Sequence, residues 1–200
     1  AGVGRMTAPS LVLASASPRR AELLERVGYA FTIRPADVDE SVDPGEAAPD
    51  YAARVTAAKA AAVWEPGVVV VAADTCVIAP GGQILGKPTD AVDAVRMLRS
   101  LSGATHTVLS AVRVLGPDGR HIDVTASALV RFAPAEPEVL AAYVAGGEPM
   151  DKAGAYALQG QGAALVESVD GDPTTVIGLP LRQTVAALRS VGLAPPAFGA

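Results

Sequence analysis

The stretch VVVVAAD (residues 68–74) is continuously apolar and ends in a carboxylate. Its four valines are β-branched, and a run without polar alternation is typical of a strand that is buried on both faces. Such a strand belongs at the centre of a sheet with helices on both sides. In open α/β sheets, ligands gather at the carboxyl ends of the strands. The stretch therefore predicts the central strand of the fold, ending at Asp74 in a ligand site.

Helical and strand-like segments alternate on either side of this stretch. Residues 11–14 predict a short buried strand, and residues 18–27 predict a helix with Ser17 at its N-cap and Gly28 just past its end. We expect further helices at 51–64, 90–101, within 133–147 and at 180–190, and further strands at 31–34, 105–115, 121–132 and near 163–169. The alternation predicts an α/β fold with a mixed sheet flanked by helices.

The composition argues against several classes of protein. Twenty-one acidic and 16 basic residues give a net charge of −5, so we expect no nucleic-acid partner and no membrane surface. A single cysteine excludes an internal disulfide, and only two histidines argue against a histidine-based metal cluster. No apolar run reaches the length of a membrane span, and the start of the sequence lacks a signal-peptide pattern. These features predict a cytoplasmic protein.

The stretch SASPRR (residues 15–20) follows the first predicted strand with almost no spacer. A helix start offers unpaired N–H groups and a partial positive charge, which suit an anion. The hydroxyls of Ser15 and Ser17 and the guanidinium groups of Arg19 and Arg20 would add donors for phosphate oxygens. An ordinary helix cap with solvated arginines is the alternative, although two cations in a first turn oppose the helix dipole. On this stretch alone, both interpretations stay open.

Three further side chains have the chemistry of a phosphate site. Asp74 could hold a metal or activate a water. Lys87, held between a glycine and a proline, could supply a point charge, and the amide of Gln159 lies in a glycine-rich segment that allows close backbone approach. The alternatives are a strand-end turn, a solvated lysine and a surface amide.

The cysteine and the histidines receive no catalytic role. We expect Cys76 to be a small core residue. His106 is expected to hydrogen-bond locally at the start of a strand, and His121 is expected to be exposed after a hairpin turn.

Several motifs together resemble the Maf family of nucleoside triphosphate pyrophosphatases, first named for a septum-formation phenotype. The motifs stand in the family's order between residues 11 and 193: LASASPRRAELLERVG, DVDE, AADTCV, ILGKPTD, MLRSLSGATHTV, EPMDKAGAYALQGQGAALVESVDGD and VIGLPL. The resemblance implies a two-lobed α/β fold, as in inosine-triphosphate pyrophosphatases, with a substrate cleft between the lobes. It implies hydrolysis of a nucleoside triphosphate to the monophosphate and pyrophosphate with a divalent metal, Mg²⁺ or Mn²⁺.

Site residues follow from the same resemblance. Arg19, Thr75 and Gln159 match the branch that acts on dTTP and UTP, whereas a sibling branch for 7-methyl-GTP lacks this glutamine. Asp74 matches the proton acceptor, and with Glu40 it would hold the metal. Other matches to pocket motifs are Ser15, Arg20, Glu40, Lys59 and Lys87, and Ser17 is expected to bind phosphate from the helix start. The chain departs from the family at residues 173–175, which are Pro-Thr-Thr, and at Ala157, where glycine is common.

The expected organisation is an extension at residues 1–10, one catalytic domain at 11–193 and a tail at 194–200. The resemblance leaves a homodimer open. It also leaves two other functions to be weighed: a pyrophosphatase for dITP- or XTP-type purine nucleotides, and a cell-division regulator that acts by binding a partner.

Overall fold

The computed structural model describes residues 9–196, so most of the predicted extension and the last four residues of the tail lie outside the described residues. The strands are β1 (Ser10–Leu13), β2 (Thr32–Ile33), β3 (Val68–Ile78), β4 (Ile84–Leu85), β5 (Thr105–Leu115), β6 (His121–Phe132) and β7 (Val166–Asp170). The α-helices are α1 (Pro18–Arg26), α2 (Ala48–Val63), α3 (Ala91–Leu101), α4 (Pro137–Ala145), α5 (Pro173–Ile177) and α6 (Leu181–Ser190). Three short 3₁₀ helices are η1 (Glu148–Asp151), η2 (Ala153–Ala155) and η3 (Gln161–Leu165).

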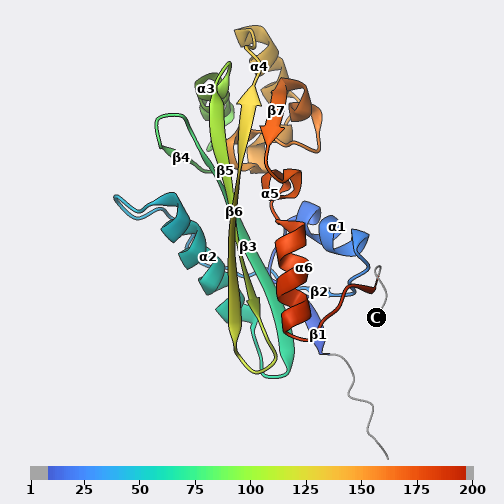
Figure 1. Ribbon diagram of the computed structural model, residues 1–200. Helices are drawn as coiled ribbons and strands as arrows, with labels where there is room; N and C mark the ends of the chain where they lie inside the picture. The colour runs from blue at the N-terminus through green and yellow to red at the C-terminus, as the bar shows by residue number, and fades with distance from the viewer. Residues whose placement is uncertain (1–8, 197–200) are drawn as a thin grey trace, which may run out of the picture.

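One mixed sheet runs through the molecule in the order β2-β1-β3-β5-β6-β7, with β4 paired to β3. Strand β1 runs parallel to β2 and β3, and the other pairs are antiparallel. The long strands β3, β5 and β6 extend through two lobes (Figure 1). The first lobe holds β1, β2, α1, α2 and α6, and the second holds α3, α4, the 3₁₀ helices, β4 and β7. The predicted two-lobed α/β class is confirmed.

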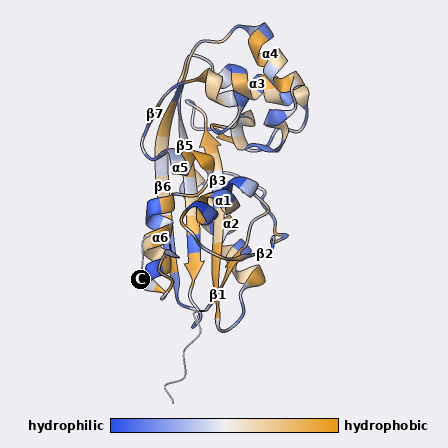
Figure 2. Cartoon of the chain, turned by 90° about the vertical axis from the view of Figure 1, so that its right-hand side faces the viewer, coloured by the Kyte–Doolittle hydropathy of each residue, from blue (hydrophilic) through white to orange (hydrophobic). Residues whose placement is uncertain are grey.

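The valine run forms the centre of the sheet, as predicted. Val69, Val70 and Val71 have no exposed surface. Val69 and Val71 pack in the cluster formed with α1 and α6, whereas Val70 packs in the cluster on the α2 face. Both faces of β3 are therefore covered, and Figure 2 shows β1 and β3 coloured mainly as hydrophobic. This double cover explains why the stretch carries no polar alternation.

The prediction that this strand ends at Asp74 is wrong, because β3 continues to Ile78. Strand β1 stops opposite Val71, but the antiparallel partner β5 stays paired to β3 as far as Ile78. Asp74 therefore lies within β3, three residues beyond Val71, which is the last β3 residue paired to β1. The loss of β1 at this point leaves room for a polar side chain.

Other predicted boundaries shift by a few residues. Helix α2 begins at Ala48 rather than at residue 51, because Pro49 is tolerated in a first turn. Residues 163–165 belong to η3, so the last strand starts only at Val166. The short elements β4 and α5 were not predicted; α5 starts where Asp172 accepts a hydrogen bond from Thr174 N at 2.8 Å.

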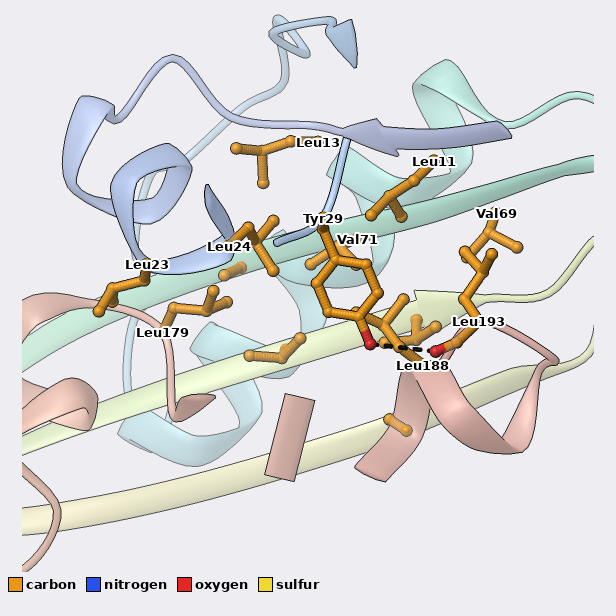
Figure 3. Packing of buried hydrophobic residues seen from close by; sticks show 14 of the residues in the cluster. Leu11, Leu13, Leu23, Leu24, Tyr29, Val69, Val71, Leu179, Leu188 and Leu193 are labelled. Atoms are coloured by element: carbon orange, nitrogen blue, oxygen red, sulfur yellow. Dashed lines mark hydrogen bonds between the residues drawn. The ribbon is translucent and has the colours of Figure 1, made fainter. Parts of the chain in front are cut away.

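The core of the first lobe joins α1 and α6 to the sheet. Leu13 of β1, Leu24 of α1 and Leu188 of α6 are fully buried members of one hydrophobic cluster (Figure 3). The Tyr29 hydroxyl donates a hydrogen bond to the Leu193 carbonyl at 3.0 Å, which fastens the end of the described chain to this core. Within residues 9–196, no helix has both the length and the apolar character needed to cross a membrane.

Leu188→Ala should lower the free energy of unfolding by about 2–5 kcal/mol, because it removes a fully buried side chain and leaves a cavity. Val92→Ala, at an 80% exposed position on α3, should change it by no more than about 0.5 kcal/mol. Urea denaturation of both variants checks this, and equal effects would contradict the assigned core.

Candidate active site

A cleft of about 510 Å³ lies between the two lobes. The first lobe contributes the turn from β1 into α1, together with side chains of α2 and β3, and the second lobe contributes Lys87 and the segment 151–159. All the site residues predicted from the sequence line this cleft: Ser15, Ser17, Arg19, Arg20, Glu40, Lys59, Asp74, Thr75, Lys87 and Gln159. The fold thus gathers residues that are up to 144 positions apart into one cavity.

The start of α1 opens into this cleft without a side-chain cap. Ser17 occupies the N-cap position as predicted, but its side chain makes no capping hydrogen bond. The Ser17 carbonyl accepts the first helical bond from Ala21 N at 3.3 Å, so the amides of Arg19 and Arg20 precede the hydrogen-bonded ladder. The first turn also contains no acidic residue. A helix start of this kind is suited to an anion.

The guanidinium of Arg20 is hydrogen-bonded to three groups at the wall of the cleft. It donates to the Gly178 carbonyl at 2.9 Å, to Ser15 Oγ at 3.0 Å and to Thr75 Oγ1 at 3.2 Å. Burial lowers the pKa of Arg20, and the nearby Asp74 carboxylate opposes that shift. The group stays charged at neutral pH, and these three bonds fix its orientation. Two of its five N–H groups are left over for a ligand, which fits its predicted contact with phosphate.

Thr75 belongs to a directional chain of hydroxyl groups. Ser110 Oγ donates to the Thr175 carbonyl at 2.8 Å, so Thr75 Oγ1 donates to Ser110 Oγ at 2.7 Å and accepts from Arg20. Ser110 and Thr175 are fully buried and were not predicted. A serine within the apolar alternation of β5 was the available signal for Ser110. These hydrogen bonds connect Arg20 to Thr175 within α5.

The floor of the cleft carries a buried ion pair. Lys59 Nζ lies 2.8 Å from Asp74 Oδ1 and 2.9 Å from Glu40 Oε1. Lys59 and Asp74 are 7% and 5% exposed, so each charge depends on the other for compensation. The second carboxylate oxygen, Asp74 Oδ2, is buried and has no hydrogen-bond partner among the described residues. Lys59, predicted to bind phosphate, is thus held first of all by two carboxylates.

Three carboxylates line this cleft, and two of them, Glu40 and Asp74, meet at Lys59, whereas Asp151 is ion-paired with Lys152. Within residues 9–196, no group of three or more His, Cys, Asp or Glu side chains converges on one point. Magnesium commonly binds proteins through one or two carboxylates and takes its other ligands from water and substrate phosphates. The unpartnered Asp74 Oδ2 and the adjacent Glu40 carboxylate fit that type of site.

The second-lobe wall is built around glycines. Gly154 N donates to the Gly86 carbonyl at 3.0 Å, which ties the Lys87 turn to η2. Gly154 has φ +68°, and an added Cβ would lie 2.8 Å from Val77 Cγ2, so only glycine fits here. Lys152, ion-paired with Asp151, also lines the cleft and was not singled out from the sequence, although it stands in the DKAG motif.

The histidines and the cysteine have the following environments. Cys76 is buried, and burial raises the pKa of its thiol to about 12, as expected for a core residue. His121 is exposed, as predicted. The prediction of a local partner for His106 is wrong: its Nε2 lies 2.8 Å from the hydroxyl of Tyr156, fifty residues away, and its ring packs edge-on against Phe132. Tyr156 lines the cleft, so His106 supports the cleft wall from behind.

Together, the fold and the cleft define a two-lobed α/β protein whose site is suited to a polyanionic ligand. The Maf-like protein family model matches residues 10–191, and the chain belongs to this family.

Relatives that carry the name dTTP/UTP pyrophosphatase align with nearly the whole chain. The relative from Anaeromyxobacter dehalogenans (strain 2CP-1 / ATCC BAA-258) is 53% identical over 94% of this chain and 97% of its own length. The relative from Hahella chejuensis (strain KCTC 2396) is 47% identical over 92% of each chain. Among solved structures, the Staphylococcus aureus Ham1 protein aligns with a TM-score of 0.45 and 14% identity, covering 64% of this chain and 73% of that chain.

The buried His106 should make folding stability depend on pH. Burial lowers the pKa of His106 from 6.5 to about 4, so the unfolded chain binds a proton that the folded chain excludes. Stability should therefore fall as the pH drops from 6.5 and level off below about 4, with a total loss of roughly 3 kcal/mol from this group. The difference in unfolding free energy between wild type and His106→Gln, measured from pH 7 to pH 4, isolates this effect. His121→Gln is the control, and parallel pH curves for wild type and His106→Gln would contradict the assignment.

Proposed function

We propose that this protein hydrolyses dTTP and UTP to the nucleoside monophosphate and pyrophosphate. The observation that carries the proposal is the uncapped start of α1, which opens into the same cleft as the Asp74 carboxylate. The names of the relatives support the reaction and the substrates. The predicted specificity residues Arg19, Thr75 and Gln159 all line this cleft, which is consistent with the dTTP/UTP branch.

Release of pyrophosphate requires attack at the α-phosphorus, so the site must stabilise charge along all three phosphates. The amides at the start of α1 would bind phosphate oxygens from the first lobe, next to the Arg19 guanidinium. Lys87 would approach the chain of phosphates from the second lobe. Binding would thus draw ligands from both sides of the cleft.

Asp74 would be the catalytic base. Its Oδ1 accepts from Lys59, whereas its Oδ2 has no partner in the described part of the chain. Each oxygen of an ionised carboxylate has two lone pairs, so Oδ2 could face the cation proposed below with one and accept a proton from the attacking water with the other. Ser15 would act indirectly. Its Oγ accepts hydrogen bonds from Arg20 and from Ser17 N, and these bonds hold the turn before α1 in place.

We also propose that Asp74 and Glu40 hold a divalent cation, Mg²⁺ or Mn²⁺, together with substrate phosphates. When bound, the cation would neutralise phosphate charge and lower the pKa of a coordinated water. Before the cation binds, the positive charge of Lys59 would offset the electrostatic repulsion between the Asp74 and Glu40 carboxylates.

The nucleobase of the substrate would be recognised by Gln159, an exposed residue that lines the cleft. Thymine and uracil present an N3–H donor beside carbonyl acceptors, and one amide group can complement such a pair. Cytosine reverses this pattern and would leave polar groups unpaired.

The proposed activity is tested by pyrophosphate release from dTTP, UTP, CTP, dITP and XTP with Mg²⁺ or Mn²⁺. We expect turnover of dTTP and UTP, and a loss of about 10²–10⁴-fold in kcat for Asp74→Asn, because its amide cannot accept the proton of the water. Asp118→Asn, on the exposed hairpin turn, is the control with unchanged turnover. Preference for the purine nucleotides would contradict the substrate, and an active, folded Asp74→Asn would remove Asp74 as the base.

Gln159→Ala should lower the preference for UTP over CTP by about tenfold while leaving most of the activity on CTP, because the phosphate contacts remain. The measurement is the ratio of kcat/KM values for the two nucleotides. Gln83→Ala, an exposed glutamine in a turn of the same lobe, serves as the matched control. An unchanged ratio in Gln159→Ala would mean that the base is read elsewhere.

A further inference from the structure

We infer that Glu148 and Tyr143 are positioning residues that hold the segment of residues 157–162, here called the Gln159 loop, in its base-reading conformation. This inference rests on the proposed function, because it concerns how the reading amide is placed. Neither residue lines the cleft, so each acts through the loop rather than on a substrate.

The Glu148 carboxylate gathers three donors. Its Oε1 accepts from Gln161 N at 2.9 Å, and its Oε2 accepts from Gly162 N at 2.9 Å. Oε2 also accepts from the Tyr143 hydroxyl at 2.6 Å. These amides are the first N–H groups of η3, which would otherwise lack partners at the start of that helix. Glu148 therefore satisfies the start of η3 from a different part of the chain.

The Tyr143 hydroxyl completes the arrangement on the other side of Gln159. While it donates to Glu148, it accepts from Ala157 N at 3.3 Å. The loop is thus fastened two residues before Gln159 and two residues after it, and Gln159 at the tip between these points is exposed. Residues anchored at both ends of so short a span lose most of their conformational freedom before any ligand arrives.

The two glycines of the loop are explained by these contacts. A Cβ at Gly160 would overlap Oε1 of Glu148, and a Cβ at Gly162 would lie 2.6 Å from the Tyr143 hydroxyl. The sequence suggested that these glycines allow a ligand to approach the backbone. In the structure, the groups that approach their backbone most closely are Glu148 and Tyr143.

A carboxylate is specifically suited to position 148. All three neighbours donate, so an amide side chain would present its own donor to one of them. Burial opposes ionisation of Glu148, but the bonds from Tyr143 and from the amides of Gly162 and Gln161 outweigh it and lower its pKa. The group is therefore ionised at neutral pH, where a charge-assisted hydrogen bond is strongest.

The functional test is the UTP-to-CTP ratio of kcat/KM in Glu148→Gln, Gln159→Ala and the double variant. We expect Glu148→Gln to lower the ratio by about five- to tenfold, mainly through KM for UTP, and the double variant to fall no further than Gln159→Ala alone. Glu138→Gln, on the exposed face of α4, is the matched control and should keep the wild-type ratio. A wild-type ratio in folded Glu148→Gln, or additive effects in the double variant, would overturn the inference.

The structural test needs no substrate and separates this inference from the proposed function. Amide hydrogen exchange should rise at least about tenfold at Gln161 and Gly162 in Glu148→Gln and at Ala157 in Tyr143→Phe, with the rest of the second lobe unchanged. Unchanged exchange in both variants would overturn the inference even if dTTP and UTP are hydrolysed. Conversely, raised exchange in a protein that turns over no pyrimidine nucleotide would refute the proposed function and its base-reading role while leaving the loop anchors in place. If Glu148→Gln fails to fold, Tyr143→Phe carries both tests.

Discussion

Strand β1 leaves the sheet after Leu13, while β3 and β5 stay paired to Ile78, and the site depends on this difference in length. Beyond Leu13 the chain turns directly into α1, so the helix start faces the edge that β1 has vacated. Asp74 lies on that edge and projects into the cleft. A β1 that stayed paired beyond Asp74 would fill the edge of the sheet beside this residue and displace the helix start. The cleft is therefore a consequence of unequal strand lengths in one sheet.

Polar groups in the cleft are kept in place by partners from distant parts of the chain. Lys59 of α2 holds Asp74 of β3, and Arg20 of α1 reaches the turn after α5. Each of these groups carries a charge that would be costly to bury alone. Their mutual bonds supply the compensation and also fix their geometry. The same contacts thus serve stability and the arrangement of the site.

The sequence was sufficient where a short stretch determines its own structure. The valine run, the Ser-Pro helix start and the hairpin turn before His121 were predicted from neighbouring residues alone, and the motif pattern identified ten of the residues that line the cleft. It failed where a distant partner decides. The length of β3 is set by β5, and the environment of His106 is set by Tyr156. The role of Glu148 depends on donors 13 and 14 residues away that only the folded chain brings to it.

The sharing of β3, β5 and β6 by both lobes has a mechanical consequence (Figure 1). Two lobes joined by a single linker rotate about a few residues, whereas these lobes are parts of one continuous hydrogen-bonded ribbon. Any widening of the gap between them must be distributed as a change of twist along three strands. The lobes should therefore move relative to each other less than lobes joined by a hinge, and the cleft between them should keep its shape when no ligand is bound.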